Sequence, residues 1–327
     1  MGFVEDELQE IKAMVEKHIT GSKLEACIPA MVRVNIRRTK FKQLIVCLQF
    51  PKNYPAANIL VELKSRHISQ KLLDGLANLS EKEAKKILGK PQILHVLKFV
   101  RNFIDENPLC CCSEEISELK QKIARPSDEI KLKQKTSSIL VITMEGEYSC
   151  KYNITVPEDY PDTRVSLTEV SSSYPPVVRR WLLAQAQELA RQCVEPPTRC
   201  RPGAPPFVVK PSLLPVVKFL LEAVHSIPAA VCGVCCRTCL PPHPQDVPSS
   251  EDDPLSVERV YCGHFYHHAC LDTYIKTPPF AGGKTCHSCS LKIYHDKWKL
   301  SPALVEARWA HKQARQRELD EAIDFFA

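Results

Sequence analysis

The sequence has no long apolar run: no segment approaches the roughly 20 consecutive apolar residues that cross a bilayer. Its first ten residues are acidic and lack the basic and apolar regions of a secretory signal. Asp6 stands where myristoylation of Gly2 would need Ser or Thr. We therefore expect no membrane partner and a cytoplasmic or nuclear location.

The excess of positive over negative charge is also small. The formal net charge is +6 over 327 residues, and no basic tail or block is present. Nucleic-acid-binding domains concentrate lysine and arginine on one face or segment, so we expect no nucleic-acid partner. Apolar residues make up 44% of the chain, and its length is sufficient for two or three domains, each with a core of its own.

Three segments of the chain recur in the same order about one hundred residues later. The larger offset of the third pair implies about 14 extra residues in the second copy, and the proline-rich segment Glu195–Pro206 is the natural place for them. The paired segments are Asp6–Lys12 with Glu114–Lys120 at an offset of 108, Phe50–Pro55 with Val156–Pro161 at 106, and Leu94–Val100 with Leu214–Leu220 at 120.

Within the first copy, apolar spacing predicts a helix, then strands, then helices. Sequential strands with short connections favour an antiparallel sheet, and flanking helices can cover one face of it. The sequence therefore predicts an α+β fold built from two-layer domains. The helical spacing involves Leu8, Ile11 and Val15 and returns from Ser69 to Asn107, and the strand-like segments are Met31–Ile36, Gln43–Phe50 and Asn58–Leu63.

A Tyr-Pro pair, Tyr54-Pro55 in the first copy and Tyr160-Pro161 in the second, lies after a strand and before another. This arrangement resembles the RWD domain, a ubiquitin-conjugating-enzyme-like fold without a catalytic cysteine. The resemblance covers about two thirds of the chain as two tandem RWD-like sandwiches and implies binding of a protein substrate or partner. The family often carries a second proline where Ile59 and Val165 stand here, and the alternative is two unrelated α+β domains.

Neither copy carries the His-Pro-Asn stretch and following active-site cysteine of a conjugating enzyme, so conjugating activity is not expected. Cys47 and Cys150 lie in strand-like, apolar segments, so we expect them to be small buried residues without a chemical role. The run Cys110, Cys111 and Cys112 lies between the two copies, and its role does not follow from the sequence.

The chain contains 16 cysteines, and in a reducing compartment such a number points to metal binding rather than to disulfides. After Pro228, cysteine and histidine are concentrated in about sixty residues. Zinc takes four tetrahedral ligands from thiolate and imidazole, and a two-residue gap lets two side chains reach one ion. Eight ligands therefore imply two Zn²⁺ ions: Cys232, Cys235, Cys262, His264, His267, Cys270, Cys286 and Cys289.

The order and gaps of these eight residues resemble the RING-H2 finger at every ligand position. In that family the ligand pairs interleave as a cross-brace, which implies one ion held by Cys232, Cys235, His267 and Cys270 and another held by Cys262, His264, Cys286 and Cys289. Each ion would be enclosed by four protein ligands, as in a structural rather than a catalytic zinc site. The pair Cys236 and Cys239 has the same two-residue gap and stays an alternative to Cys232 and Cys235.

Most RING fingers are ubiquitin ligases (E3), which hold a ubiquitin-loaded conjugating enzyme (E2) in a reactive pose without a covalent intermediate. The residues here that match the E2-binding groove of the family are Val234, Leu271 and Tyr274; alternatively, these three side chains pack the small core of the finger itself. His287 and Ser290 depart from the family at positions that often carry proline and a basic residue, and Lys292 lies two residues beyond Ser290.

The order of RWD-like pair and C-terminal RING finger resembles the Fanconi anaemia L type of ubiquitin ligase. It implies a ligase that recruits an E2 through its finger and a protein substrate or complex subunit through the RWD-like pair. The alternative function is a non-catalytic, zinc-stabilised scaffold. The predicted domains are 1–110 and 113–228 for the two RWD-like copies, 229–295 for the finger, and 296–327 for an amphipathic helix. This helix could dock on the finger or on a partner, and packing on its own protein is favoured.

Overall fold

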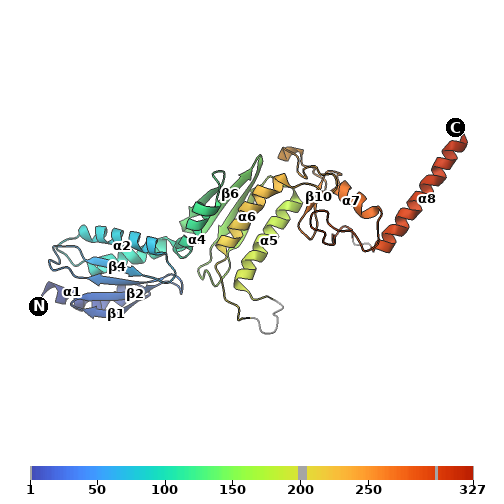
Figure 1. Ribbon diagram of the computed structural model, residues 1–327. Helices are drawn as coiled ribbons and strands as arrows, with labels where there is room; N and C mark the ends of the chain where they lie inside the picture. The colour runs from blue at the N-terminus through green and yellow to red at the C-terminus, as the bar shows by residue number, and fades with distance from the viewer. Residues whose placement is uncertain (1, 198–204, 299–300, 327) are drawn as a thin grey trace. The chain divides into compact units, whose positions relative to one another are not determined.

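The computed structural model describes residues 2–197, 205–298 and 301–326 (Figure 1). It has a mixed α/β fold with antiparallel sheets and with Cys/His clusters near the C-terminus, which confirms the predicted α+β class at this level. The chain divides into two compact units. The first comprises residues 1–142, 152–168 and 185–219, and the second comprises residues 143–151, 169–184 and 220–327.

The first repeat forms a four-stranded antiparallel sheet in the order β1-β2-β3-β4. Alternate strand residues, such as Val34 in β2 and Val46 in β3, are fully buried in one core with residues of three helices. This alternation follows from the two-residue period of a strand, which sends successive side chains to opposite faces. The elements are α1 (Phe3–His18), β1 (Ser22–Ile28), β2 (Met31–Arg37), β3 (Gln43–Gln49), β4 (Leu60–Lys64), α2 (Gln70–Lys85) and α3 (Ile93–Glu106).

The three predicted strands of this repeat are confirmed as β2, β3 and β4, and the predicted helices as α1, α2 and α3. Strand β1 was not predicted. Its sequence has only Ile28 as a β-branched residue, and none of its side chains is fully buried. It pairs with β2 across a short turn and through a bulge between Leu24 and Ala26, so pairing with its neighbour rather than its own composition makes it a strand.

The second repeat again places a four-stranded sheet between helical segments, and its strand order is β5-β6-β7-β8. Segments of this repeat contribute to both units. Its elements are α4 (Ser113–Glu118), η2 (Leu119–Ile123), β5 (Glu129–Lys133), η3 (Gln134–Thr136), β6 (Ser138–Glu145), β7 (Tyr148–Thr155), β8 (Ser166–Ser172), α5 (Pro176–Val194), α6 (Leu213–Ser226) and η4 (Ile227–Ala229).

The structure places the five cysteines that were discussed from the sequence outside the finger. Cys47 and Cys150 are buried, as expected from their strand contexts. The run of three cysteines forms η1 (Pro108–Cys112), in which Cys110 and Cys112 are buried. Burial raises the pKa of the Cys110 thiol to about 11, so the neutral thiol is favoured there.

Both repeats contain the same tyrosine–glutamate network at the start of a late helix. In the first repeat, the Tyr54 hydroxyl donates to the Glu7 carboxylate, which accepts the Ile93 backbone N–H at 2.8 Å. The Tyr54 oxygen also accepts the Gln92 N–H at 3.0 Å. These bonds satisfy N–H groups in the first turn of α3, which have no partner within the helix itself.

The second repeat reproduces this network with Tyr160 and Glu115, which lie 106 and 108 residues after Tyr54 and Glu7. The Tyr160 hydroxyl donates to Glu115 at 2.5 Å, and Glu115 accepts the Leu214 N–H at 2.9 Å. The Leu213 N–H donates to the Tyr160 oxygen at 3.1 Å. The two Tyr-Pro turns are therefore equivalent in structure as well as in sequence, and each connects the first helix of its repeat to the last.

The segment Glu195–Pro206, predicted to hold the extra residues, falls largely outside the described residues. Its flanks are held together by a backbone hydrogen bond from the Lys210 N–H to the Cys193 carbonyl, 2.9 Å long. The helices on either side, α5 and α6, are continuous up to these flanks.

The second unit contains the region rich in cysteine and histidine. Its elements after α6 are short, with the exception of the final helix, and no helix among the described residues has the length and hydropathy to span a bilayer. Within this unit the Trp181 ring of α5 meets the Phe265 ring edge-on, and the Tyr148 hydroxyl donates to the Pro241 carbonyl at 2.8 Å. The elements are η5 (Pro244–Asp246), β9 (Val257–Arg259), β10 (Phe265–His267), α7 (His268–Lys276) and α8 (Pro302–Phe326).

Candidate metal centre

Two groups of four side chains converge in the second unit, each offering donor atoms that lie within 4.8 Å of one another. The groups are interleaved along the chain: the first and third pairs of ligands meet, and so do the second and fourth. One group is Cys232, Cys235, His267 and Cys270, and the other is Cys262, His264, Cys286 and Cys289. The structure thus brings together all eight residues named from the sequence, in the predicted grouping.

The separations within the groups suit tetrahedral coordination. With zinc–sulfur bonds near 2.3 Å and zinc–nitrogen bonds near 2.0 Å, the edges of the tetrahedron should be about 3.5–3.8 Å. The His267 Nδ1 atom lies 3.3 Å from the Cys235 sulfur and 3.9 Å from the Cys270 sulfur. In the second group, His264 Nδ1 lies 3.5 Å from the Cys262 sulfur. Both clusters are therefore consistent with zinc.

Two Cys-x-x-Cys turns have the same backbone geometry. In the first turn the Cys236 N–H donates to the Cys232 carbonyl at 2.9 Å, and in the second the Ser290 N–H donates to the Cys286 carbonyl at 2.8 Å. The residue after the second cysteine is left-handed in both, with φ of 57° at Cys236 and 59° at Ser290. Each turn directs its two sulfurs to the same side, which is what a shared ion requires.

The matching backbone of the two turns helps to decide whether Cys236 and Cys239 are ligands. Cys236 occupies the left-handed position that Ser290 occupies in the other turn, and its side chain is exposed. Cys239 is buried but does not belong to either four-residue group among the described residues. The geometry therefore favours Cys232 and Cys235 over Cys236 and Cys239.

A second set of contacts orients the ligands. His267 has its Nε2 atom 3.1 Å from the Thr238 carbonyl, so this nitrogen carries the proton and Nδ1 is left to face the cluster. The Tyr266 hydroxyl lies 3.0 Å from the Cys286 sulfur and accepts the His287 N–H at 3.2 Å. A hydrogen bond from the phenol stabilises thiolate charge on Cys286. These partners were not predicted, because Thr238 and Tyr266 are unremarkable in the sequence.

Gly263 separates Cys262 from His264 and has a φ of 101°. Residues with a side chain rarely adopt this conformation, whereas glycine does so at little cost. The backbone at this position lets neighbouring ligands of the second cluster approach the same point. Gly263 therefore contributes to the geometry of the second cluster.

The other histidines of the region have protein partners. His268 Nδ1 lies 2.8 Å from the buried carboxylate of Glu258, which also contacts His295 at 3.2 Å and Lys297 at 2.6 Å. Burial opposes ionisation of Glu258, but these hydrogen bonds outweigh it and lower its pKa to about 2. This ionic cluster fixes the segment that follows the last cysteine. It places His268 in a structural role.

The three residues proposed to bind an E2 differ in accessibility. Val234 is 38% exposed on the first Cys turn. Tyr274 is partly exposed, and its hydroxyl donates to the Thr285 carbonyl at 3.0 Å while its ring packs against His287. Leu271 is 0% exposed and lies in the core of the finger, so a partner cannot touch it directly. For Leu271 the structure therefore favours the alternative considered from the sequence, packing within the finger.

Chemically, each cluster offers four protein donors, which leaves no position of a tetrahedral ion for substrate. Four protein ligands are typical of structural zinc sites, whereas catalytic zinc sites keep one position open. Comparison with known proteins finds no family model and no curated protein that matches the chain.

Proposed function

We propose that the protein is a RING-type E3 ubiquitin ligase. In this function, the finger binds a ubiquitin-loaded E2, and the tandem RWD-like repeats bind a protein substrate or complex subunit. The ligase forms no covalent intermediate; it orients the thioester and an incoming amine so that a loose encounter becomes a directed one.

The single observation that carries the proposal is the interleaving of the two four-residue clusters. Interleaved ligand pairs are what the RING-H2 resemblance predicts, whereas tandem zinc fingers would pair ligands consecutively along the chain. Two ions held in this way, here structural Zn²⁺, connect distant segments of a short sequence and fix their relative positions. The role of zinc is then to build a binding surface.

The surface expected to meet the E2 includes Val234 and Tyr274. Val234 lies on the first Cys turn, where its exposed side chain is available to a partner. The Tyr274 ring is held in place by its hydroxyl bond to Thr285 and by the Lys284 ammonium, 4.6 Å from the ring centre. An aromatic side chain held by its surroundings is a typical energetic centre of a small interface.

The RWD-like assignment of the repeats is supported by the equivalent networks of Tyr54 with Glu7 and Tyr160 with Glu115. These networks establish that the chain contains one structural design twice. Binding of a substrate by this pair belongs to the proposal and rests on the resemblance.

A scaffold without ligase activity is the second candidate, and two residues favour it. His287 packs its ring against Tyr274 where active fingers often have proline, with ring centres 4.4 Å apart. Ser290 stands in place of the basic residue that bridges ubiquitin and E2 in many active fingers, and its left-handed backbone belongs to the second Cys turn.

The test is single-turnover release of ubiquitin from a panel of preloaded E2 enzymes to free lysine, with the full-length, zinc-loaded chain. We expect stimulation by the wild type and at least a roughly tenfold loss in Val234→Ala, because a lost anchor at an interface costs more than 1 kcal/mol. Val231→Ala is the matched control: Val231 is also exposed and precedes the first ligand.

Zinc content is measured for each variant, so that loss of activity is separated from loss of the fold. If no E2 is stimulated by wild-type protein that holds two zincs, the ligase proposal fails and the scaffold function replaces it. Equal loss in Val231→Ala and Val234→Ala would contradict the predicted surface.

A further inference from the structure

Among the side chains that the structure describes, those of the first turns of α8 contact the finger. Val305 is buried, and the Trp309 ring lies 6.0 Å from the Phe280 ring. Beyond Gln313, every side chain that the structure describes in this helix is exposed, including Leu319 at 52% and Ile323 at 65%. Isolated helices are marginally stable in water and usually depend on packing of an apolar face. The second half of α8 therefore lacks packing within the described chain.

The exposed apolar residues of α8 continue the stripe that begins at the finger. Steps of four and three residues alternate along it, which is the spacing of a coiled-coil seam. The residues at these positions are Val305, Trp309, Lys312, Gln316, Leu319 and Ile323. The seam is apolar at both ends and polar in the middle.

Charge is divided between the two halves of the helix. Residues 302–317 carry four basic side chains and one acid, Glu306, and residues 318–326 carry four acids and no basic side chain. This order is unfavourable for a single helix, since the helix dipole prefers acids at the N-terminal end and bases at the C-terminal end. It is favourable when two such helices lie antiparallel, because each acidic half then faces a basic half.

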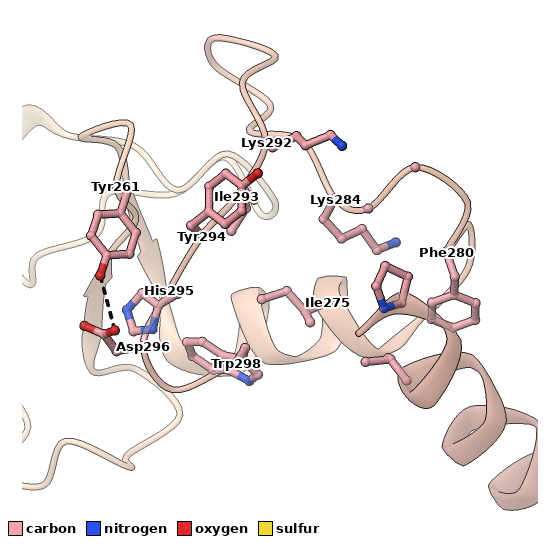
Figure 2. A pocket seen from close by; sticks show the side chains of 14 residues that line it. Tyr261, Ile275, Phe280, Lys284, Lys292, Ile293, Tyr294, His295, Asp296 and Trp298 are labelled. Carbon is pink, nitrogen blue, oxygen red and sulfur yellow. Dashed lines mark hydrogen bonds between the residues drawn. The ribbon is translucent and has the colours of Figure 1, made fainter. Parts of the chain in front are cut away.

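A hollow of about 640 Å³ lies beside the first turn of α8. Figure 2 shows Ile275 and Trp298 on one side of it and the ammonium groups of Lys284 and Lys292 on the other. Asp296 also lines the hollow, and it accepts the Tyr261 hydroxyl at 3.2 Å. Val305 lines the hollow and is also a seam residue, so the hollow and the seam lie on the same side of α8. An apolar floor with a lysine rim suits a ligand that is apolar and acidic.

We propose that α8 pairs antiparallel with α8 of a second copy of this chain, about a twofold axis at the level of Ala314. The acidic half of each helix then covers the hollow of the other copy. Ile323 of one copy then enters the hollow that Val305 of the other lines, Trp309 lies opposite Leu319, and Lys312 lies opposite Gln316. The Gln316 amide nitrogen donates to Asp320 within its own helix at 2.9 Å, and its amide oxygen then accepts from the lysine.

The same seam in parallel orientation is less favourable at its centre, because Lys312 would face Lys312 of the second copy. The residues beside the seam make different contacts in the two orientations. The antiparallel pair brings Glu306 near Asp320 of the second copy, a like-charge contact that opposes pairing. A parallel pair would instead bring Arg315 near Asp320 and leave Glu306 beside Ser301.

The first test is sedimentation equilibrium of the full-length, zinc-loaded chain. We expect a dimer, with Ile323→Asp and Leu319→Asp each weakening association at least roughly tenfold, because an apolar seam position becomes charged. Both side chains are exposed in the single chain, so these variants should keep the fold. Ala314→Asp is the matched control, since it adds the same charge on the outer face of the helix and should stay dimeric.

Orientation and the hollow are tested by charge changes. Glu306→Lys should tighten the dimer several-fold. Lys292 makes no ion pair among the described residues, and Lys292→Glu should weaken the dimer at low salt. A wild-type monomer at all concentrations, or a dimer insensitive to Ile323→Asp, would overturn the proposal. So would a dimer that Arg315→Glu weakens and Glu306→Lys leaves unchanged, because that is the parallel pair.

An unchanged dimer in Lys292→Glu would overturn the placement of the acidic half in the hollow. None of these measurements involves ubiquitin, so the inference stands or falls separately from the proposed ligase function.

Discussion

The first sheet region and the finger differ in the size of their apolar cores. The first repeat buries a continuous core of aliphatic side chains, contributed by its strands and all three of its helices. Apart from the cluster residues, the finger buries few apolar side chains: Leu240, Val257, Val260, Phe265, Tyr266, Leu271 and Phe280, together with the Cys239 thiol. The first repeat excludes water from a large core, whereas the finger has a small core and two clusters that could hold metal ions. The two regions should therefore respond differently to the same perturbation.

The largest expected effect is zinc removal. A chelator, or Cys262→Ser at one cluster, should unfold the finger, since structural zinc binding contributes on the order of 10–16 kcal/mol in finger peptides. Hydrogen–deuterium exchange should show lost protection across residues 229–298. The first sheet should keep its protection under the same conditions. Unchanged protection in the finger after complete zinc loss would show that its small core is sufficient.

The next effect in size should be confined to the other region. Leu48 is fully buried at the centre of the first sheet, and Leu48→Ala should cost about 2–5 kcal/mol through lost burial and a residual cavity. Urea unfolding measures this change, and zinc content should stay at two ions. The matched control is Leu60→Ala in β4, where the side chain is 49% exposed and the expected cost is below about 0.5 kcal/mol.

A smaller effect concerns the polar networks of the repeats. Tyr54→Phe and Tyr160→Phe each remove a hydroxyl that bonds a glutamate and a helix N–H, and each should cost about 1–3 kcal/mol. Glu7 is buried and Glu115 is half-buried. Thermal or urea unfolding of the full chain provides the measurement. Tyr294→Phe changes an exposed tyrosine and should be neutral. Effects of very different size in the two repeats would contradict their equivalence.

The smallest effect is a pH dependence. Burial raises the pKa of Glu7 and of Glu115 above the ordinary value of 4.5, despite opposing hydrogen bonds from the tyrosines. Between 4.5 and the raised values the folded protein binds more protons than the unfolded chain, so stability should fall as pH rises through this window. The double variant Glu7→Gln and Glu115→Gln should flatten that slope in urea titrations at several pH values. A slope unchanged by the double variant would assign it to other groups.

Much of the first repeat could be predicted because its strands and helices have distinct apolar periods. The segments Met31–Ile36 and Gln43–Phe50 alternate or concentrate β-branched and leucine residues, and both are strands in the structure. Strand β1 could not be found in this way, because its pairing with β2 rather than its composition defines it. The partnership of Tyr54 with Glu7 was also missed, although nearly equal repeat offsets for both residues were a usable signal.

In the finger, spacing predicted which eight side chains converge, because ligand gaps are a short-range property of the chain. Spacing could not decide between exposed and buried roles for Val234 and Leu271, since both are aliphatic residues next to ligands. Spacing alone left Cys236 and Cys239 as an alternative pair, because the left-handed backbone that removes Cys236 from the cluster depends on the turn as a whole. The C-terminal helix was predicted to pack on its own protein, but beyond Gln313 the described side chains of α8 are exposed.

The hydrogen bond between the Lys210 N–H and the Cys193 carbonyl has a practical consequence. It joins the last turn of α5 to the segment just before α6 and so closes the base of the proline-rich connection. Added residues at such a closed base cost little, because loop-closure entropy grows only slowly with length. A fluorescent or affinity tag inserted between Pro197 and Pro205 would therefore label the full-length protein without altering the finger or the tyrosine networks.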